Sequence, residues 1–496
     1  MEVALAYDHH TTLLTSLESA ALDFAVNTRR PPVAFRGRVK EPVLLRQFLL
    51  ALHNVILGDF RWVSDEEWLR TLDPVITVHP DQLFFEAFSN DESVYARLSA
   101  PFEAFEPEGE PSFGTTNIDF TWGLRDALQS LRTSRRTSFT VGAGGFGVTT
   151  AVGARARVHF ERKVNVPEGW LKGFLQVQGA LAMRPFVFDV RPVDLLTVIA
   201  FFQDNKPLRP PHGLRYEFQP GEPVRIVLEP WEERFTLKGT HYTGYARTVR
   251  LWGRRRMELL LGILPYAERV TVGVLGRGLP HFYVCHCGPY QFVLALSGWT
   301  QNDWSKGSAF DLLAPQVEAH PEQTALAYNA LARRLVAGRT QIAEETGLPP
   351  AETEQALFQL CRAGRVIFDP TTMAYRLREL FAEALDVNKL FAPDPRIEAA
   401  RRLLDAGRVS LRNVTDPDPS QGGRRETRAA AVVEDDVAYE VSVAVDGNGR
   451  LRFGRCECQF FQNNLMSRGP CAHILAARLA LDARGIPVPD WPRSLK

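Results

Sequence analysis

Near the carboxy terminus, three cysteines and one histidine have a spacing that constrains the local fold more than any other feature of the chain. The four residues are Cys456, Cys458, Cys471 and His473. Three thiolates and one imidazole complete the tetrahedral coordination of zinc and leave no vacant position for water or substrate. We therefore predict that these residues hold Zn2+ as a structural cofactor.

The surrounding sequence places the two ligand pairs on different elements. Alternating apolar and polar residues predict two strands, Tyr439 to Val445 and Arg450 to Phe453, joined by a turn at Asp446 to Gly449. Cys456 follows the second strand, and a helix is predicted from Cys471 to Ala483. Thiolates at a helix start are stabilised by the positive end of the helix dipole. One ion would thus join hairpin to helix.

The pattern Cys-x-Cys, spacer, Cys-x-His resembles the SWIM zinc finger over about residues 436–484, and bacterial proteins that contain it in particular. The four residues match its ligand positions one for one, and the resemblance implies binding of nucleic acid or of protein. Arginines near the cluster are the expected nucleic-acid contacts: Arg450, Arg452, Arg455 and Arg468. Together with Phe460 and Phe461 they suit phosphate and unstacked bases. The same mixture of side chains suits a protein interface, so both alternatives stay open.

The first 312 residues contain four similar runs of strands, each with one helix. The predicted helices are Val43 to Leu57, Gly123 to Leu131, Val193 to Phe202 and Trp252 to Leu264. The β-α-β-β-β order resembles the DNA sliding clamp, with two repeat domains at 1–166 and 167–312. In such clamps basic helix faces contact the DNA backbone. Arg250, Arg254 and Arg255 are therefore further candidate nucleic-acid contacts, with an ordinary solvated face as the alternative.

Residues 320–385 are predicted to form three helices and a hairpin. The helices are Ala325 to Leu335, Thr340 to Glu345 (capped by Thr340) and Glu352 to Ala363, and the hairpin joins 366–368 to 375–377. This order resembles a winged helix-turn-helix. The third helix would read bases, yet it begins with Glu352 and Glu354, which repel phosphate. A DNA reader and a packing or protein-docking module both remain possible.

Several other signals are interpreted as structural. Cys285 and Cys287 lie on one side of an alternating strand and His286 on the other, which favours a buried pair over a metal site. The glycines at 142–147 precede a strand, so they do not form a dinucleotide-binding turn. The adjacent acids Asp435 and Asp436 lie beside a turn, where solvated side chains are expected. No catalytic constellation is found, and we expect no enzyme activity.

Charge and hydropathy limit the possible partners. The chain of 496 residues has 58 basic and 58 acidic side chains, so attraction to nucleic acid must come from local patches. It has no run of about eighteen apolar residues and no leader-like start, so we expect a soluble cytoplasmic protein without a membrane partner. Six cysteines are too few for a disulfide scaffold.

Together these features predict an α+β multidomain protein with two clamp-like repeat domains, a winged helix and a SWIM zinc-finger domain at 390–490. The expected function is a non-enzymatic zinc-binding scaffold that contacts nucleic acid, DNA in preference to RNA, through the finger and the basic helices. The alternative is an adaptor that docks a protein such as an AAA+ ATPase without nucleic acid. Self-association is also compatible with clamp-like domains.

Overall fold

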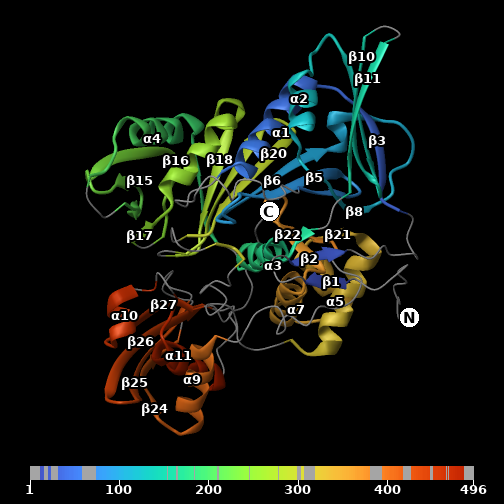
Figure 1. The fold of residues 1–496 in the computed structure, drawn as a ribbon. Helices are drawn as coiled ribbons and strands as arrows, with labels where there is room; N and C mark the ends of the chain where they lie inside the picture. Colours follow the sequence, from blue (N-terminus) through green and yellow to red (C-terminus); the bar gives the residue numbers. More distant parts are fainter. Residues whose placement is uncertain are drawn as a thin grey trace.

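A computed structural model describes most of the chain. The described residues are 12–15, 20–23, 32–58, 74–152, 155–163, 166–183, 185–208, 212–244, 246–276, 279–298, 303–305, 319–379, 394–416, 426–446, 451–464, 466 and 469–484. The fold comprises an amino-terminal body, a module at 319–379 and a carboxy-terminal module at 394–484 (Figure 1).

The body is organised around one antiparallel sheet that spans both predicted repeat domains. The order of its twelve strands is β17 (Arg247–Leu251), β14 (Leu214–Phe218), β15 (Pro223–Leu228), β16 (Glu233–His241), β13 (Phe186–Val190), β18 (Arg269–Val274), β19 (His281–Cys287), β20 (Tyr290–Leu296), β6 (Val94–Pro101), β5 (Gln82–Phe88), β4 (Val75–Val78) and β8 (Gly114–Asn117). Phe292 of β20 pairs with Leu98 of β6, so the sheet is continuous between the two halves of the body.

Two smaller sheets complete the body. The first has the order β11 (Arg155–Arg162), β10 (Gly145–Val152), β9 (Arg136–Gly142), β3 (Ala34–Val39) and β7 (Phe105–Pro107). The second has the order β1 (Thr12–Thr15), β2 (Ala20–Asp23) and β12 (Val166–Pro167). The predicted hairpin around the glycines is the β9–β10 connection, and a strand follows it as expected.

The helices of the body match the predicted order, with one correction and one addition. They are α1 (Pro42–Ile56), α2 (Trp122–Gln129), α3 (Glu168–Ala182) and α4 (Pro192–Asp204), and the short helical segments are η2 (Phe102–Ala104), η3 (Arg254–Gly262) and η4 (Leu264–Tyr266). The fourth predicted helix is therefore a 3₁₀-helix, η3, followed by a second short turn. Helix α3 was not predicted, and almost every position from Trp170 to Met183 is buried.

The 319–379 module contains three helices and a three-stranded sheet. The helices are α5 (Pro321–Arg334), α6 (Arg339–Thr346) and α7 (Pro350–Arg362), and the sheet order is β21 (Val336–Ala337), β23 (Ala374–Leu377) and β22 (Val366–Asp369). Thr340 is not the helix cap, since α6 begins after Gly338, whose N–H donates to Gln341 Oε1. Gly347 ends α6 in the left-handed conformation, as its position after the helix predicts.

The β22–β23 hairpin of this module is buried against the body. The side chain of Asp369 accepts hydrogen bonds from Arg97 of β6 at 2.6 Å and from Arg376 of β23 at 2.9 Å. Leu377 O lies 2.9 Å from His79 Nε2, and the Gln178 side chain of α3 accepts from the Phe368 N–H. Helix α7 packs on α3. The hairpin and the third helix therefore pack against the body.

The carboxy-terminal module is a four-stranded antiparallel sheet with helices on one face. Its elements are α9 (Pro395–Asp405), β24 (Val409–Thr415), β25 (Glu426–Glu434), β26 (Ala438–Asp446), β27 (Leu451–Cys456), α10 (Gln459–Asn464) and α11 (Ala472–Arg484). Helix α11 packs on α9 and on all four strands. The sequence predicts a loop at 416–428, where Asp, Pro and Gly are frequent. Strand β24 ends just before this stretch, and the first residues of β25 lie within it.

Candidate metal centre

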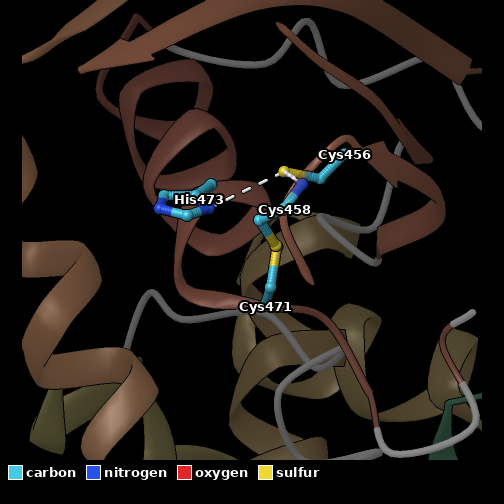
Figure 2. A group of neighbouring side chains, drawn as sticks. All are labelled: Cys456, Cys458, Cys471 and His473. Carbon is cyan, nitrogen blue, oxygen red and sulfur yellow. Dashed lines mark hydrogen bonds between the residues drawn. The ribbon is translucent and has the colours of Figure 1, made fainter. Parts of the chain in front are cut away.

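The four predicted ligands converge between the end of the sheet and the start of α11. Cys456 is the last residue of β27, Cys458 lies between β27 and α10, and Cys471 and His473 lie at the start of α11. Their candidate ligand atoms all lie within 4.8 Å of one another, and all four residues are buried. Figure 2 shows the three thiols and the imidazole turned toward one another. The residues that the spacing predicts as one site are therefore neighbours in the fold.

The spacing of the donor atoms fits a tetrahedral zinc ion. Zn–S bonds of about 2.3 Å and Zn–N bonds of about 2.0 Å place the donors of a tetrahedral site roughly 3.5–3.8 Å apart. His473 Nδ1 lies 3.7 Å from Cys456 Sγ, the pair joined by a dashed line in Figure 2. The donor set offers four ligands on two elements, so a bound ion would cross-link β27 to α11 and would have no open position for a substrate.

A carboxylate orients the histidine from outside the cluster. His473 Nε2 lies 3.2 Å from Asp435 Oδ2, so the ring directs its other nitrogen, Nδ1, at the cysteines. The Tyr439 ring stacks on the imidazole at a centroid distance of 4.3 Å, and the Tyr439 hydroxyl donates to Asp436. Carboxylate partners of this kind fix the tautomer of a metal-binding histidine.

The roles of Asp435 and Tyr439 were missed in the sequence. Asp435 follows β25 and Tyr439 is in β26, and both approach His473 of α11 only because the strands pack against this helix. The adjacent acids were expected to be solvated, and no sequence signal distinguishes Asp435 from other acids beside turns.

Contacts within the cluster shift the pKa values of its thiols. The hydrogen bond with Cys471 lowers the pKa of Cys456 to about 4, and His473 contributes in the same direction. The same hydrogen bond raises the pKa of Cys471. Desolvation raises the pKa of Cys458. A cluster that already favours one thiolate suits a cation, because a divalent ion offsets the cost of ionising the remaining thiols.

Close packing of β27 on α11 depends on a glycine. A Cβ atom at Gly454 would lie 2.9 Å from Ile474 Cγ2, closer than carbon atoms normally approach. Gly454 alternates with Phe453 and Arg455, which are exposed on the opposite face. The absence of a side chain at 454 therefore lets the strand carrying Cys456 approach the helix carrying His473.

Two of the four nucleic-acid contacts predicted beside the cluster fall within the described residues. Arg455 is exposed and Arg452 half-buried on β27, whereas Arg450 and Arg468 lie outside the described residues. Phe461 is buried, and Phe460 packs against the guanidinium of Arg396 at 5.2 Å. Of the two arginines that are described, Arg455 is therefore the exposed one.

The prediction of an exposed basic face at Arg250, Arg254 and Arg255 is wrong for Arg254, which is buried. Arg254 is 4% exposed and donates to the backbone carbonyls of Gly213 and Glu229, with its guanidinium 4.8 Å from the Trp231 ring. Arg250 forms an ion pair with Glu229 at 2.6 Å. Arg255 alone of the three candidates is exposed. A buried arginine needs all its hydrogen bonds within the fold, so Arg254 contributes to packing and not to an exposed face.

Other signals have the structural roles that the sequence predicts. Cys285 and Cys287 are buried on β19, and desolvation raises the pKa of Cys287 to about 12. His286, on the other face, lies 3.1 Å from the Thr271 hydroxyl.

Among the residues that the structure describes, the Cys456 cluster is the one group of metal-ligating side chains. No helix in the described ranges is long and apolar enough to cross a membrane.

Solved structures resemble part of the chain. A proliferating cellular nuclear antigen from Entamoeba histolytica matches 54% of this chain and 99% of its own, with 13% sequence identity and a TM-score of 0.39. A PCNA2–PCNA3 complex from Sulfolobus tokodaii matches 54% of this chain and 100% of its own, with 9% identity and a TM-score of 0.40. These values report a distant likeness to sliding clamps in part of the chain.

Sequence comparison identifies a much shorter region. No curated protein matches the chain. All four candidate ligands, Cys456, Cys458, Cys471 and His473, lie inside the region that a family model matches. Residues 439–482 match the model of the SWIM zinc finger family.

Proposed function

We propose that the protein is a non-enzymatic scaffold whose carboxy-terminal module is stabilised by zinc and binds DNA. The observation that supports this most directly is the closed donor set of Cys456, Cys458, Cys471 and His473, all buried and within 4.8 Å of one another. Four protein ligands leave no coordination site for a reacting group, so the metal supports structure. With a structural metal inside it, the module would bind DNA through its surface and not at the metal.

Two of the three arginines of the body that the sequence predicts as DNA contacts are engaged within the fold, and the third, Arg255, is exposed. Arg254 is buried, and Arg250 is paired with Glu229. Exposed arginines are also found on the sheet of the carboxy-terminal module, Arg412 on β24 and Arg455 on β27. Contacts between arginine and phosphate supply binding that does not depend on sequence and weakens as salt displaces it.

The winged-helix-like module at 319–379 is proposed as a packing unit. Its hairpin is buried against the body through Asp369 and Arg376. The two carboxylates that begin α7 are engaged within the module, because Glu352 accepts from Gln323 and Glu354 pairs with Arg339. A reading helix and wing need exposed faces for a DNA groove.

The test is DNA binding by the zinc-loaded full chain. Fluorescence anisotropy with labelled single-stranded and duplex DNA is expected to show binding at low salt. The affinity should fall steeply as salt rises. The Cys458→Ser variant should lose this binding together with its zinc. Absence of measurable binding to either DNA at low salt would refute the proposal.

A second candidate, a protein adaptor for a partner such as an AAA+ ATPase, has one observation in its favour. Strand β11 is the edge of its sheet, and Val158 and Phe160 on it are 66% and 52% exposed. An edge strand with exposed apolar side chains can pair with another chain, although exposed arginines also lie on β11. A stoichiometric protein complex that survives nuclease treatment and is lost in Phe160→Ser would support the adaptor.

A further inference from the structure

The sheet of the carboxy-terminal module has two faces of different character. Alternate residues of β25, Thr427, Ala429, Ala431 and Val433, are buried on the side where α11 packs. Gly454 and Cys456 of β27 lie on this same inner face, since a Cβ at Gly454 would contact Ile474 of α11. The residues between them therefore form an outer face opposite the metal and the helices.

Strand register brings separate arginines into line on this outer face. Arg412 of β24 pairs with Ala430 of β25, Ala430 with Ser442 of β26, and Ser442 with Arg455 of β27. Residues paired across strands lie on the same face. Two exposed arginines thus lie at the ends of a row whose central residues are small. With strands spaced at about 4.8 Å, Arg412 and Arg455 are about 14 Å apart.

The neighbouring row adds a third arginine and an aromatic ring. Its members in strand order are Thr415, Arg428, Ala444 and Phe453. The Phe453 side chain is 49% exposed although it is large and apolar. The Arg428 side chain is 43% exposed, and its ion pair with Glu426 is long, at 3.5 Å. Arg412 and Arg455 form no ion pair with any residue that the structure describes.

Acidic side chains border this band and do not interrupt it. Glu440 lies in the row beyond Arg412 and Arg455, paired with Val432, and Glu426 lies in the row on the opposite side, beyond Phe453. The positive charge is therefore confined to two adjacent rows. A narrow positive band fits one phosphate backbone better than a broad surface, because the flanking acids repel a second strand.

We propose that this outer face, formed by Arg412, Arg428, Phe453 and Arg455, binds single-stranded DNA. The inference rests on the proposed DNA-binding function and specifies its surface. The guanidinium groups contact phosphates, and the exposed Phe453 ring stacks on a base, which is accessible only when unpaired. A protein partner is less favoured, since the small side chains Ala430, Ser442 and Ala444 form no apolar pocket for an anchoring residue.

The experiment measures anisotropy of labelled oligothymidylate and of a mixed-sequence duplex with the zinc-loaded full chain. The double variant Arg412→Ala, Arg455→Ala should bind oligothymidylate more weakly. Its slope of log affinity against log salt should be smaller by about 1.4, or about 0.7 for each lost contact. The Phe453→Ala variant should lose about 5- to 150-fold in affinity, which corresponds to roughly 1–3 kcal/mol.

A matched control removes the same charge elsewhere on the module. Arg401 and Arg402 are exposed on α9, on the side of the sheet that carries the helices, so Arg401→Ala, Arg402→Ala should keep the wild-type affinity. All variants change exposed residues, and equal zinc content confirms that they fold. Selective loss in the outer-face variants, with weaker binding of duplex by wild type, would support the proposal.

The outcomes separate the two proposals. If wild type binds DNA and the outer-face variants match the control, this surface is wrong while the proposed function stands. If wild type prefers duplex, or if polyglutamate binds through the same arginines while oligothymidylate does not, single-stranded DNA is the wrong ligand. If wild type binds neither DNA, the proposed function fails and this inference fails with it.

Discussion

Arg97 and Asp369 form an ion pair at 2.6 Å although 272 positions separate them in the chain, and both side chains are almost completely buried. Asp369 also accepts from Arg376, whose guanidinium makes two further contacts with Asp81. Through this network the 319–379 module is joined to the β4–β6 part of the body. Loss of this carboxylate would leave two buried guanidinium groups without their shared counterion.

Removing Asp369 tests this network. Asp369→Ala leaves Arg97 and Arg376 buried without their shared partner, and we expect a loss of about 3–5 kcal/mol in the free energy of unfolding, measured with urea. Arg191→Ala breaks an exposed ion pair with Asp194 and should cost about 0–1 kcal/mol. Similar losses in the two variants would show that the network contributes no more than a surface pair.

The pH dependence of stability follows from a histidine at the same interface. Desolvation, with a contribution from Arg376, lowers the pKa of His79 from 6.5 to about 3. Between pH 6.5 and about 3, the unfolded chain therefore binds one more proton at His79 than the folded chain. The contribution of His79 to stability is thus complete above pH 6.5 and is lost as the pH falls toward 3. His79→Gln should reduce the slope of unfolding free energy below pH 6.5 by about 1.4 kcal/mol per pH unit. An unchanged slope would contradict the assignment.

Zinc content tests the metal centre. Cys458→Ser and His473→Ala each remove one of four ligands, and we expect them to lose the metal and unfold the carboxy-terminal module. Metal binding on the order of 10 kcal/mol is part of the folding energy of such sites. Elemental analysis should find one zinc per wild-type chain. Cys287→Ala, at a buried cysteine outside the cluster, should keep it. Equal zinc in all proteins would rule out these ligands.

The carboxylate beside His473 should tune metal affinity without being a ligand. Asp435→Asn weakens the contact to His473 Nε2, and the expected loss of zinc affinity is about 10- to 100-fold. Competition with a chelating dye measures it. The neighbouring Glu434→Gln removes one negative charge at an exposed position and should bind zinc normally. If both variants lose affinity equally, general charge and not orientation of the ring is responsible.

Packing behind the metal centre should be sensitive at Gly454. Gly454→Val places side-chain atoms against Ile474 and should destabilise the module by about 1–3 kcal/mol. A lower temperature of zinc release, followed with a metal-sensitive dye, reports the loss. At Gly338 an added Cβ has its nearest neighbour 3.7 Å away, so Gly338→Ala should release zinc at the wild-type temperature. Unaltered release from Gly454→Val would mean that β27 and α11 can separate without cost.

The sequence alone determined the features that depend on local order. Alternation predicts the strands on either side of the turn before Cys456, and helical spacing predicts α1, α4 and α7 within a few residues. The four metal ligands could be assigned because only seventeen positions separate Cys456 from His473, and both elements that carry them have clear patterns.

Only the tertiary structure decided which distant side chains meet. Arg254 has the sequence context of an exposed basic helix, yet it is buried beside Trp231 and Glu229. Asp435 becomes a partner of His473, and Arg412 is aligned with Arg455 only through the register of four strands. Periodicity records which side of an element is apolar, whereas strand register and helix docking are set by long-range packing that no local pattern contains.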